Sequence, residues 1–260
     1  MSEQQQGINA QKLELQTADG LIDTWLFKPE GTGKWPAIIL NTDIKGVRDT
    51  FINMGKRLAS NGYVVLLPNL YYRVAVAPVI DATASLQDEK YKERFNELRA
   101  AVSIPGLYQD HKLFLNFLTK HESVSSPRIG IVGYCMSGAI ALRAAADFPE
   151  NIVAAASFHG GRLATDALDS PHLRAKEIRA RLHLGYAQND ASMSDEMIAK
   201  LETALSEAHV KVTSEHYLGR HGFAVADSAA YNPDISERHW QNLIALFHST
   251  LHSNPHSIQD

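Results

Sequence analysis

The chain has only one cysteine, Cys135, among its 260 residues, which excludes a disulfide within the chain and fits a reducing compartment. No apolar run approaches the ~20 residues that a membrane-spanning helix needs. The N-terminal stretch MSEQQQGINA also lacks the basic segment followed by an apolar segment that marks a signal peptide. We therefore expect a cytoplasmic protein that does not associate with a membrane.

Several signatures of binding are missing as well. The formal net charge is −4, which gives no reason to expect nucleic acid as a partner. There is no HExxH, no P-loop and no GxGxxG after a strand, so zinc-hydrolase and nucleotide-binding functions lack support. His248, His252 and His256 are spaced four apart, but no carboxylate or cysteine completes a metal site and Pro255 interrupts the last turn. We expect neither a metal nor a cofactor.

The sequence contains an alternation of strand and helix patterns typical of an α/β fold, with a mainly parallel central sheet and helices on both faces. An antiparallel hairpin is predicted at 12–16 and 21–27. Further strands are predicted at 36–40, 63–68, 129–132, 152–158, 181–187 and 211–216, and helices at 51–61, 108–121, 194–208 and 236–251.

We expect one domain over 1–260, with a core at 10–252 and a frayed tail at 253–260. The segment 73–105 interrupts the alternation of strands and helices. Tyr91, Phe95, Leu98 and Val102 recur in it at helical spacing, which predicts a helix. The segment is either a packed crossover or a cap over a pocket. No pattern indicates an interface, so a monomer is the simpler expectation.

The most informative stretch is RIGIVGYCMSGAIAL at 128–142. An apolar strand pattern runs into glycine, then Cys135, and then a helix rich in small residues. A lone cysteine is more often a small buried apolar residue. Here the glycines permit a sharp strand-to-helix turn, the geometry of the nucleophile elbow of α/β-hydrolases. A helix N-terminus stabilises a thiolate, which is the reactive form of cysteine.

Two residues downstream of Cys135 suit the order nucleophile, acid, histidine found in such hydrolases. Asp190 follows the strand predicted at 181–187, and His221 follows the one predicted at 211–216. Either alone has an ordinary explanation as a loop residue. Together they predict a triad in which His221 removes the thiol proton and Asp190 orients the imidazole. The N–H of Met136 is expected to be one oxyanion donor, and the second is expected from the loop at 41–46.

These motifs resemble the dienelactone hydrolase family, also called carboxymethylenebutenolidases, over most of the chain. The family's elbow reads Gly-Tyr-Cys-x-Gly-Gly, matched by GYCMSG at 133–138, and its histidine motif is matched by HGF at 221–223. The acid motif Gly-x-x-x-x-Asp is matched at 185–190. The resemblance implies an α/β-hydrolase fold and a Cys-His-Asp triad made of Cys135, His221 and Asp190.

The resemblance also implies roles for residues earlier in the chain. The family's Glu-Ile pair corresponds to Asp43-Ile44, which makes Ile44 the second oxyanion donor and Asp43 the carboxylate facing the resting thiol. The family's Asp-Leu-Tyr-x-Arg segment corresponds to NLYYR at 69–73, which makes Arg73 the ligand of a substrate carboxylate. Tyr72 is assigned to the same substrate-binding region.

Three departures from the family pattern bear on the substrate. Ser137 replaces an elbow glycine, and Asp43 is one methylene shorter than the family's glutamate. Val225 stands where the family has its second substrate-binding arginine. The sequence offers other arginines that could replace it, namely Arg48, Arg162 and Arg220.

The turn after the strand at 152–158 adds His159, which either binds substrate or is hydrogen-bonded within its loop. We expect a hydrolase that opens a dienelactone-like enol lactone through a cysteinyl thioester. A general carboxylesterase or thioesterase with the same triad is the alternative. A non-catalytic or redox-responsive ligand-binding protein is a third possibility, which the intact triad disfavours.

Overall fold

The computed structural model describes residues 7–252. The predicted tail at 253–260, which includes His256, lies outside these residues, as do the first six. The chain divides into two compact units, one ending at Pro127 and the other beginning at Arg128. The prediction of a single domain over 1–260 stays a prediction.

The first unit contains a four-stranded arrangement built on the predicted hairpin. Its strands are β1 (Ile8–Thr17), β2 (Gly20–Pro29), β3 (Trp35–Asn41) and β4 (Val64–Pro68), in the order β1-β2-β4-β3. β1 and β2 are antiparallel, β2 pairs antiparallel with β4, and β3 pairs parallel with β4. β4 is buried along its whole length, as expected of a short, continuously apolar strand.

The helices of the first unit are α1 (Asp49–Ser60), α2 (Lys92–Ala101) and α3 (Ile104–Lys120), with a short 3₁₀ helix η1 (Glu89–Tyr91) before α2. α1 packs against β2 and β4. The helix predicted through residues 91–102 is shorter than its apolar spacing suggested. Val102 has an extended backbone, because Ser103 accepts a hydrogen bond from the Gly106 N–H and begins α3 there. Phe95 and Leu98 are buried as predicted.

The second unit is a parallel sheet with helices on both faces. Its strands are β5 (Val124–Tyr134, which begins just before the boundary), β6 (Ile152–Phe158), β7 (Arg181–Ala187) and β8 (Val212–Tyr217), in that spatial order. Its helices are α4 (Met136–Asp147), α5 (Asp195–Glu207) and α6 (Pro233–Leu251), with a 3₁₀ helix η2 (Pro171–Glu177) that sequence patterns did not predict.

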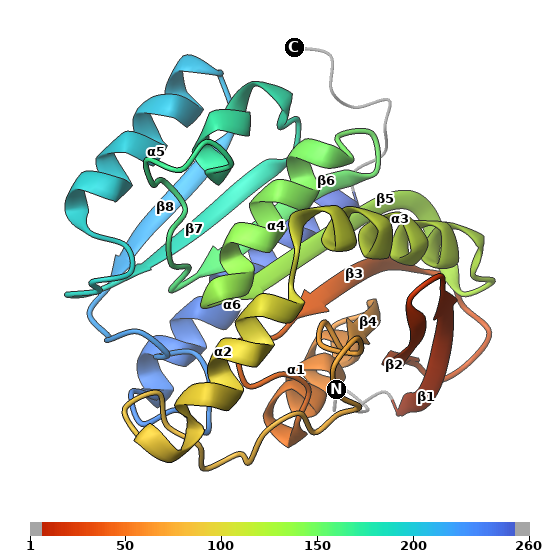
Figure 1. Ribbon diagram of the computed structural model, residues 1–260. Helices are drawn as coiled ribbons and strands as arrows, with labels where there is room; N and C mark the ends of the chain where they lie inside the picture. Colours follow the sequence, from red (N-terminus) through yellow and green to blue (C-terminus); the bar gives the residue numbers. More distant parts are fainter. Residues whose placement is uncertain (1–6, 253–260) are drawn as a thin grey trace. The chain divides into compact units, whose positions relative to one another are not determined.

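The middle of β6 explains how two helices approach this sheet. Ala154, Ala155 and Ala156 are fully buried, and such small side chains leave room for a helix on each side. α4 and α6 both contact β6, and they cover opposite faces of the sheet (Figure 1). Because the strands are parallel, their carboxyl ends share one edge, where the loops bearing Cys135, Asp190 and His221 emerge.

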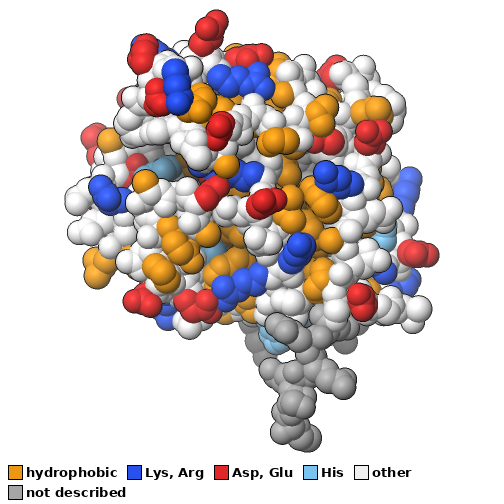
Figure 2. All heavy atoms as spheres, turned by 90° about the horizontal axis from the view of Figure 1, so that it is seen from below, with side chains coloured by type: hydrophobic (Ala, Val, Ile, Leu, Met, Phe, Trp, Pro, Cys, Tyr) orange, Lys and Arg blue, Asp and Glu red, His pale blue; other side chains and the backbone are white. Residues whose placement is uncertain are grey.

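The surface carries charges of both signs. Figure 2 shows acidic and basic side chains interspersed over one face, in keeping with the formal net charge of −4. Within residues 7–252, no helix is both long and apolar enough to cross a membrane.

Candidate active site

Cys135 lies on a sharp turn between β5 and α4. Its backbone angles are φ 58° and ψ −124°, in the left-handed region that costs a non-glycine residue about 1–3 kcal/mol. Its N–H donates to the Phe158 carbonyl at 3.2 Å, and its own carbonyl accepts from Gly138 at 3.1 Å and Gly161 at 3.2 Å. These bonds fix the strained backbone that presents the thiol. The turn therefore has the geometry of a nucleophile elbow.

The residues around the turn explain why the sequence folds this way. A β-carbon at Gly133 would lie 1.9 Å from the Ser137 carbonyl oxygen, so only glycine fits there. The buried Ser137 hydroxyl accepts from the Tyr134 N–H at 2.8 Å and donates to the Tyr134 carbonyl at 3.0 Å. The departure from glycine at Ser137 thus adds two hydrogen bonds that close the turn.

α6 contacts the same turn through His239. The Nδ1–H of the buried His239 donates to the Ser236 carbonyl at 2.9 Å, which leaves Nε2 to accept from the Tyr134 hydroxyl at 2.8 Å. Tyr134 is the residue directly before the cysteine. A buried hydrogen bond therefore links β5, the strand that leads into Cys135, to α6.

Asp190 and His221 meet although 31 positions separate them. The imidazole Nδ1 lies 2.6 Å from Asp190 Oδ2, and the side chains are 32% and 5% exposed for His221 and Asp190. Cys135 lies close enough to act on the same imidazole, since its side chain and its charge both help to raise the pKa of His221. The structure thus brings together the three residues that the sequence predicts as a triad.

These contacts alter the protonation of both partners. Burial is the largest influence on His221 and opposes its charge, but hydrogen bonds to Asp190 and Cys135 outweigh it and raise the pKa of His221 to about 10. For Asp190, burial again opposes charge, yet the hydrogen bonds from His221 and Ser192 leave the pKa of the carboxyl below its usual value. The arrangement favours an imidazolium paired with the Asp190 carboxylate.

Ser192 is a site residue that sequence reasoning missed. Its hydroxyl donates to Asp190 Oδ1 at 2.7 Å and its N–H donates to the same oxygen at 2.9 Å, so the other oxygen faces His221. The sequence did offer one local indication of Ser192, because an aspartate often accepts a hydrogen bond from the N–H two residues later. The loops of the acid and the histidine are also tied directly, since Gln188 N–H donates to the Gly219 carbonyl at 2.8 Å.

His159 follows β6 and lies against the triad. Its ring is 1% exposed and its centroid is 5.0 Å from that of His221. The alternative that the His159 ring is hydrogen-bonded within its loop is wrong, because neither ring nitrogen has a hydrogen-bond partner among the described residues. A role in substrate binding stays a prediction. Arg162, three residues later, and Arg220, beside His221, are both exposed.

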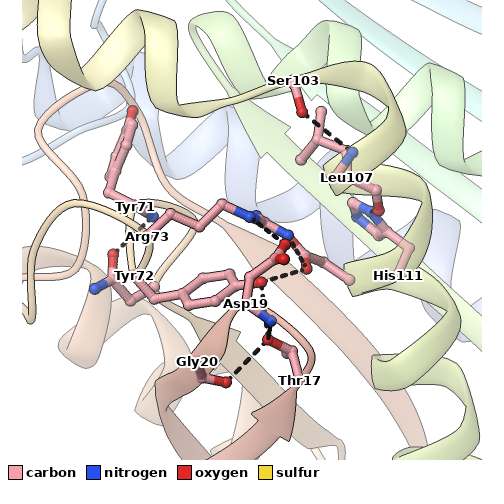
Figure 3. A network of polar contacts seen from close by, with 12 residues as sticks. Thr17, Asp19, Gly20, Tyr71, Tyr72, Arg73, Ser103, Leu107 and His111 are labelled. Atoms are coloured by element: carbon pink, nitrogen blue, oxygen red, sulfur yellow. Dashed lines mark hydrogen bonds and ion pairs between the residues drawn. The ribbon is translucent and has the colours of Figure 1, made fainter.

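Arg73 and Tyr72 belong to the first unit, where they form a polar network with the hairpin and α3 (Figure 3). Arg73 binds Asp110 through both terminal nitrogens, at 2.8 and 2.9 Å, and binds Asp19 through Nε at 2.8 Å. The hydrogen bond to Asp110 is the main reason that the pKa of Arg73 is raised above its ordinary value. A substrate carboxylate would have to displace these partners, so binding by Arg73 stays a prediction.

Tyr72 is held in the same network. Its hydroxyl donates to Asp110 at 2.9 Å and lies 3.2 Å from the Thr17 hydroxyl, with the Arg73 guanidinium 4.4 Å from its ring centroid. Burial is the main reason that the pKa of Tyr72 is raised to about 12. The predicted contact between Tyr72 and substrate also stays a prediction.

The remaining predicted residues flank the strand ends. Asp43 accepts from Arg48 at 2.8 and 2.9 Å, one bond to each carboxylate oxygen, and Ile44 is buried in the turn that follows. Met136 is the first residue of α4. Ile44 and Asp43 lie in the first unit and Met136 in the second, so their joint role around the thiol stays a prediction. Val225 is buried, 1% exposed.

The described part of the chain contains no group of three His, Cys, Asp or Glu side chains that could hold a metal ion. His248 and His252 do lie near each other, with centroids 5.1 Å apart. Helix spacing alone thus brings two imidazoles together.

A strained cysteine on a strand-to-helix turn and parallel strands covered by helices on both faces define the α/β-hydrolase class. A family model places the chain more narrowly. The model of the dienelactone hydrolase family matches residues 22–251, so the chain belongs to that family and is a hydrolase.

Individual relatives are distant but cover much of the chain. A carboxymethylenebutenolidase of Rhodococcus opacus is 24% identical over 87% of this chain and 86% of its own length. One from Pseudomonas putida is 28% identical over 54% of this chain and 56% of its own. The Klebsiella pneumoniae crystal structure titled "Putative Dienelactone Hydrolase" superimposes with a TM-score of 0.82 at 24% identity, covering 93% of this chain and 98% of that one. This likeness confirms the predicted α/β-hydrolase fold.

Proposed function

We propose that this hydrolase opens a dienelactone-like enol lactone through a thioester on Cys135. The observation that carries the proposal is the contact of His221 with both Cys135 and Asp190, at the end of a strained strand-to-helix turn. A buried structural cysteine would need neither an adjacent imidazole nor a strained backbone. The proton on His221 is the one that the departing oxygen requires.

The reaction has two halves. The Cys135 thiolate attacks the acyl carbon, the N–H groups of Met136 and Ile44 hold the oxyanion, and the C–O bond breaks as His221 protonates the leaving oxygen. Water then gives a proton to His221 and attacks the thioester carbon, and the C–S bond breaks. No cofactor takes part in either half.

His221 changes from acid to base between the two halves for an electrostatic reason. The hydrogen bond and the charge of Cys135 both help to raise the pKa of His221. Once the sulfur is acylated it carries no charge, and burial then acts against the imidazolium. The imidazole is thereby released to accept a proton from water.

A substrate with a good leaving group suits this nucleophile, because a thiolate is itself expelled more easily than a poor alkoxide. Enol lactones meet that requirement, since ring opening releases an enolate. Within the family resemblance, Asp43 would face the resting thiol and Arg73, Tyr72 and His159 would contact the substrate.

The contacts of Arg73 favour a second candidate, a carboxylesterase acting on acyl groups that have no carboxylate. All three guanidinium nitrogens are bonded to Asp19 or Asp110, and the position of the family's second arginine is the buried Val225. An uncharged lactone or ester does not require a free guanidinium. The same triad would serve it.

A paired substrate screen separates the candidates. Wild type and Cys135→Ser are assayed on enol lactones with and without a carboxylate, and on p-nitrophenyl esters of short and long acyl chains. Intact-protein mass spectrometry after rapid quenching tests for an acyl group on Cys135. Faster turnover of the carboxylate-bearing lactone supports the first candidate, and turnover of neutral substrates alone supports the second. Hydrolysis by Cys135→Ala at the wild-type rate would overturn both.

A further inference from the structure

The backbone of His159 is held in an unusual conformation beside the triad. Its φ is 39°, a left-handed value that a residue with a side chain adopts at a cost. Its N–H donates to the Gly185 carbonyl at 2.7 Å, which ties the end of β6 to β7. The backbone that carries the ring is therefore held in place by the sheet.

The ring of His159 packs against aromatic side chains and against His221. Its centroid is 5.0 Å from that of His221 at an interplanar angle of 62°, and 5.2 Å from that of Phe223 at 80°. Tyr134 lies at 5.9 Å on another side. Phe223 is in turn stacked on Tyr217 at 4.7 Å. His221 therefore packs against His159, which belongs to an aromatic cluster with Phe223, Tyr134 and Tyr217.

The nitrogens of His159 take no part in this packing. Neither Nδ1 nor Nε2 has a hydrogen-bond partner among the described residues, and both atoms are buried. Burial, followed by the charges of His221 and His239, holds the pKa of His159 well below its usual value, with Asp190 opposing. The ring thus meets its neighbours through its faces and edges while His221, bonded to Cys135 and Asp190, carries the proton.

We propose that His159 is a positioning residue whose ring forms the wall that keeps the His221 imidazole aligned with both Cys135 and Asp190. The hydrogen bond to Asp190 fixes one ring nitrogen, but it leaves the ring free to tilt about that bond. Edge-to-face packing against His159 removes this freedom. The inference rests on the proposed function, because alignment matters only if His221 transfers a proton.

The test compares His159→Ala, His159→Leu and His159→Phe with wild type. The matched control is His183→Ala, since His183 is also buried, lies on the neighbouring strand β7, and has contacts with Thr213, Phe158 and Tyr217. Two quantities are measured beside the melting temperature. One is kcat and KM on an ester that wild type hydrolyses. The other is the pH dependence of alkylation by iodoacetamide, which reads Cys135 alone because the chain has one cysteine.

We expect His159→Ala and His159→Leu to lower kcat about 10- to 100-fold, with KM changed less than about three-fold, since small misplacements of a catalytic group are costly. Alkylation in both variants should move toward the free-thiol value of about pH 8.5. His159→Phe should stay within about three-fold of wild type in both measurements. It should also melt at a higher temperature, because it removes two unpaired buried nitrogens. His183→Ala should lower only the melting temperature.

Two outcomes would overturn the proposal. Loss of activity in His159→Phe as large as in His159→Ala would mean that the nitrogens act, not the ring. Wild-type kcat and wild-type alkylation in folded His159→Leu would mean that the His159 ring is not needed to align His221. Should wild type hydrolyse none of the substrates, the proposed function fails, and alkylation still decides whether His159 aligns His221 with Cys135.

Discussion

Two ion pairs of similar burial, one in each unit, show what distinguishes a pair held by a permanent charge from a pair whose cation can lose its proton. The side chains of Asp110 and Asp190 are 2% and 5% exposed, and their cationic partners lie at 2.8 and 2.6 Å. Asp110 is bound by Arg73, whose guanidinium stays charged at any ordinary pH. Asp190 is bound by His221, whose imidazole can give up its proton.

The difference therefore lies in the cation and in its remaining contacts. Every guanidinium nitrogen of Arg73 is bonded to a carboxylate, so these contacts hold the hairpin, residues 71–75 and α3 together. His221 uses one nitrogen for Asp190 and still contacts Cys135. Burial and distance alone do not distinguish the Arg73–Asp110 pair from the His221–Asp190 pair.

The largest expected effect is on catalysis. Asp190→Asn should lower kcat about 10³–10⁴-fold, because the amide favours the wrong tautomer of His221 while the loop geometry is retained. Asp110→Asn, the equivalent change in the first unit, should leave kcat within about three-fold of wild type. Steady-state kinetics on one ester for both variants checks the contrast. Equal losses of kcat in the two variants would show that the Asp110 pair matters for catalysis as much as the Asp190 pair.

Stability should show the reverse order. Arg73→Leu leaves the buried Asp110 carboxylate without its cation and should cost about 3–5 kcal/mol in the free energy of unfolding. Adding Asp110→Leu should recover part of that loss, since no buried charge then remains. Asp19→Ala, at the exposed end of the network, should cost less than about 1 kcal/mol. Urea unfolding of the four proteins checks this series, which fails if the double variant is the least stable.

The raised pKa of His221 supplies a third test. Cys135→Ser removes the interactions of the sulfur that help to raise the pKa of His221, so this pKa should fall from about 10 toward the ordinary value near 6.5, as followed by NMR of the ring protons. The sign for stability follows from the same shift. The protonated pair stabilises the wild-type fold fully below about pH 6.5, and this contribution is lost as the pH rises through about 10. An unchanged pKa of His221 in Cys135→Ser would show that the Cys135 sulfur does not raise it.

The smallest expected effect is at the elbow. Ser137→Ala removes both hydrogen bonds to Tyr134 and should destabilise the protein by about 1–2 kcal/mol, with a modest fall in kcat because Cys135 remains in place. Ser249→Ala, which removes the hydrogen bond to the Leu246 carbonyl near the end of α6, is the control and should cost less. Thermal unfolding distinguishes the two. A larger loss at Ser249 would contradict the role given to Ser137.

Much of the fold could be read from local patterns. The strands β6 and β7 begin and end where their apolar runs predict, because a buried parallel strand is continuously apolar. The helix predicted at 91–102 was less accurate, since its end depends on the cap at Ser103. η2 has no apolar periodicity and was not predicted.

The sequence by itself determined the order of the elements, the elbow at Cys135 and the strand ends that carry Asp190 and His221, because glycine spacing and apolar runs act over a few residues. Only the tertiary structure decided which side chains those positions meet. Arg73 meets Asp110 across 37 positions, and His159 meets His221 from a different strand end. Such contacts depend on how strands and helices pack, and no local pattern encodes them.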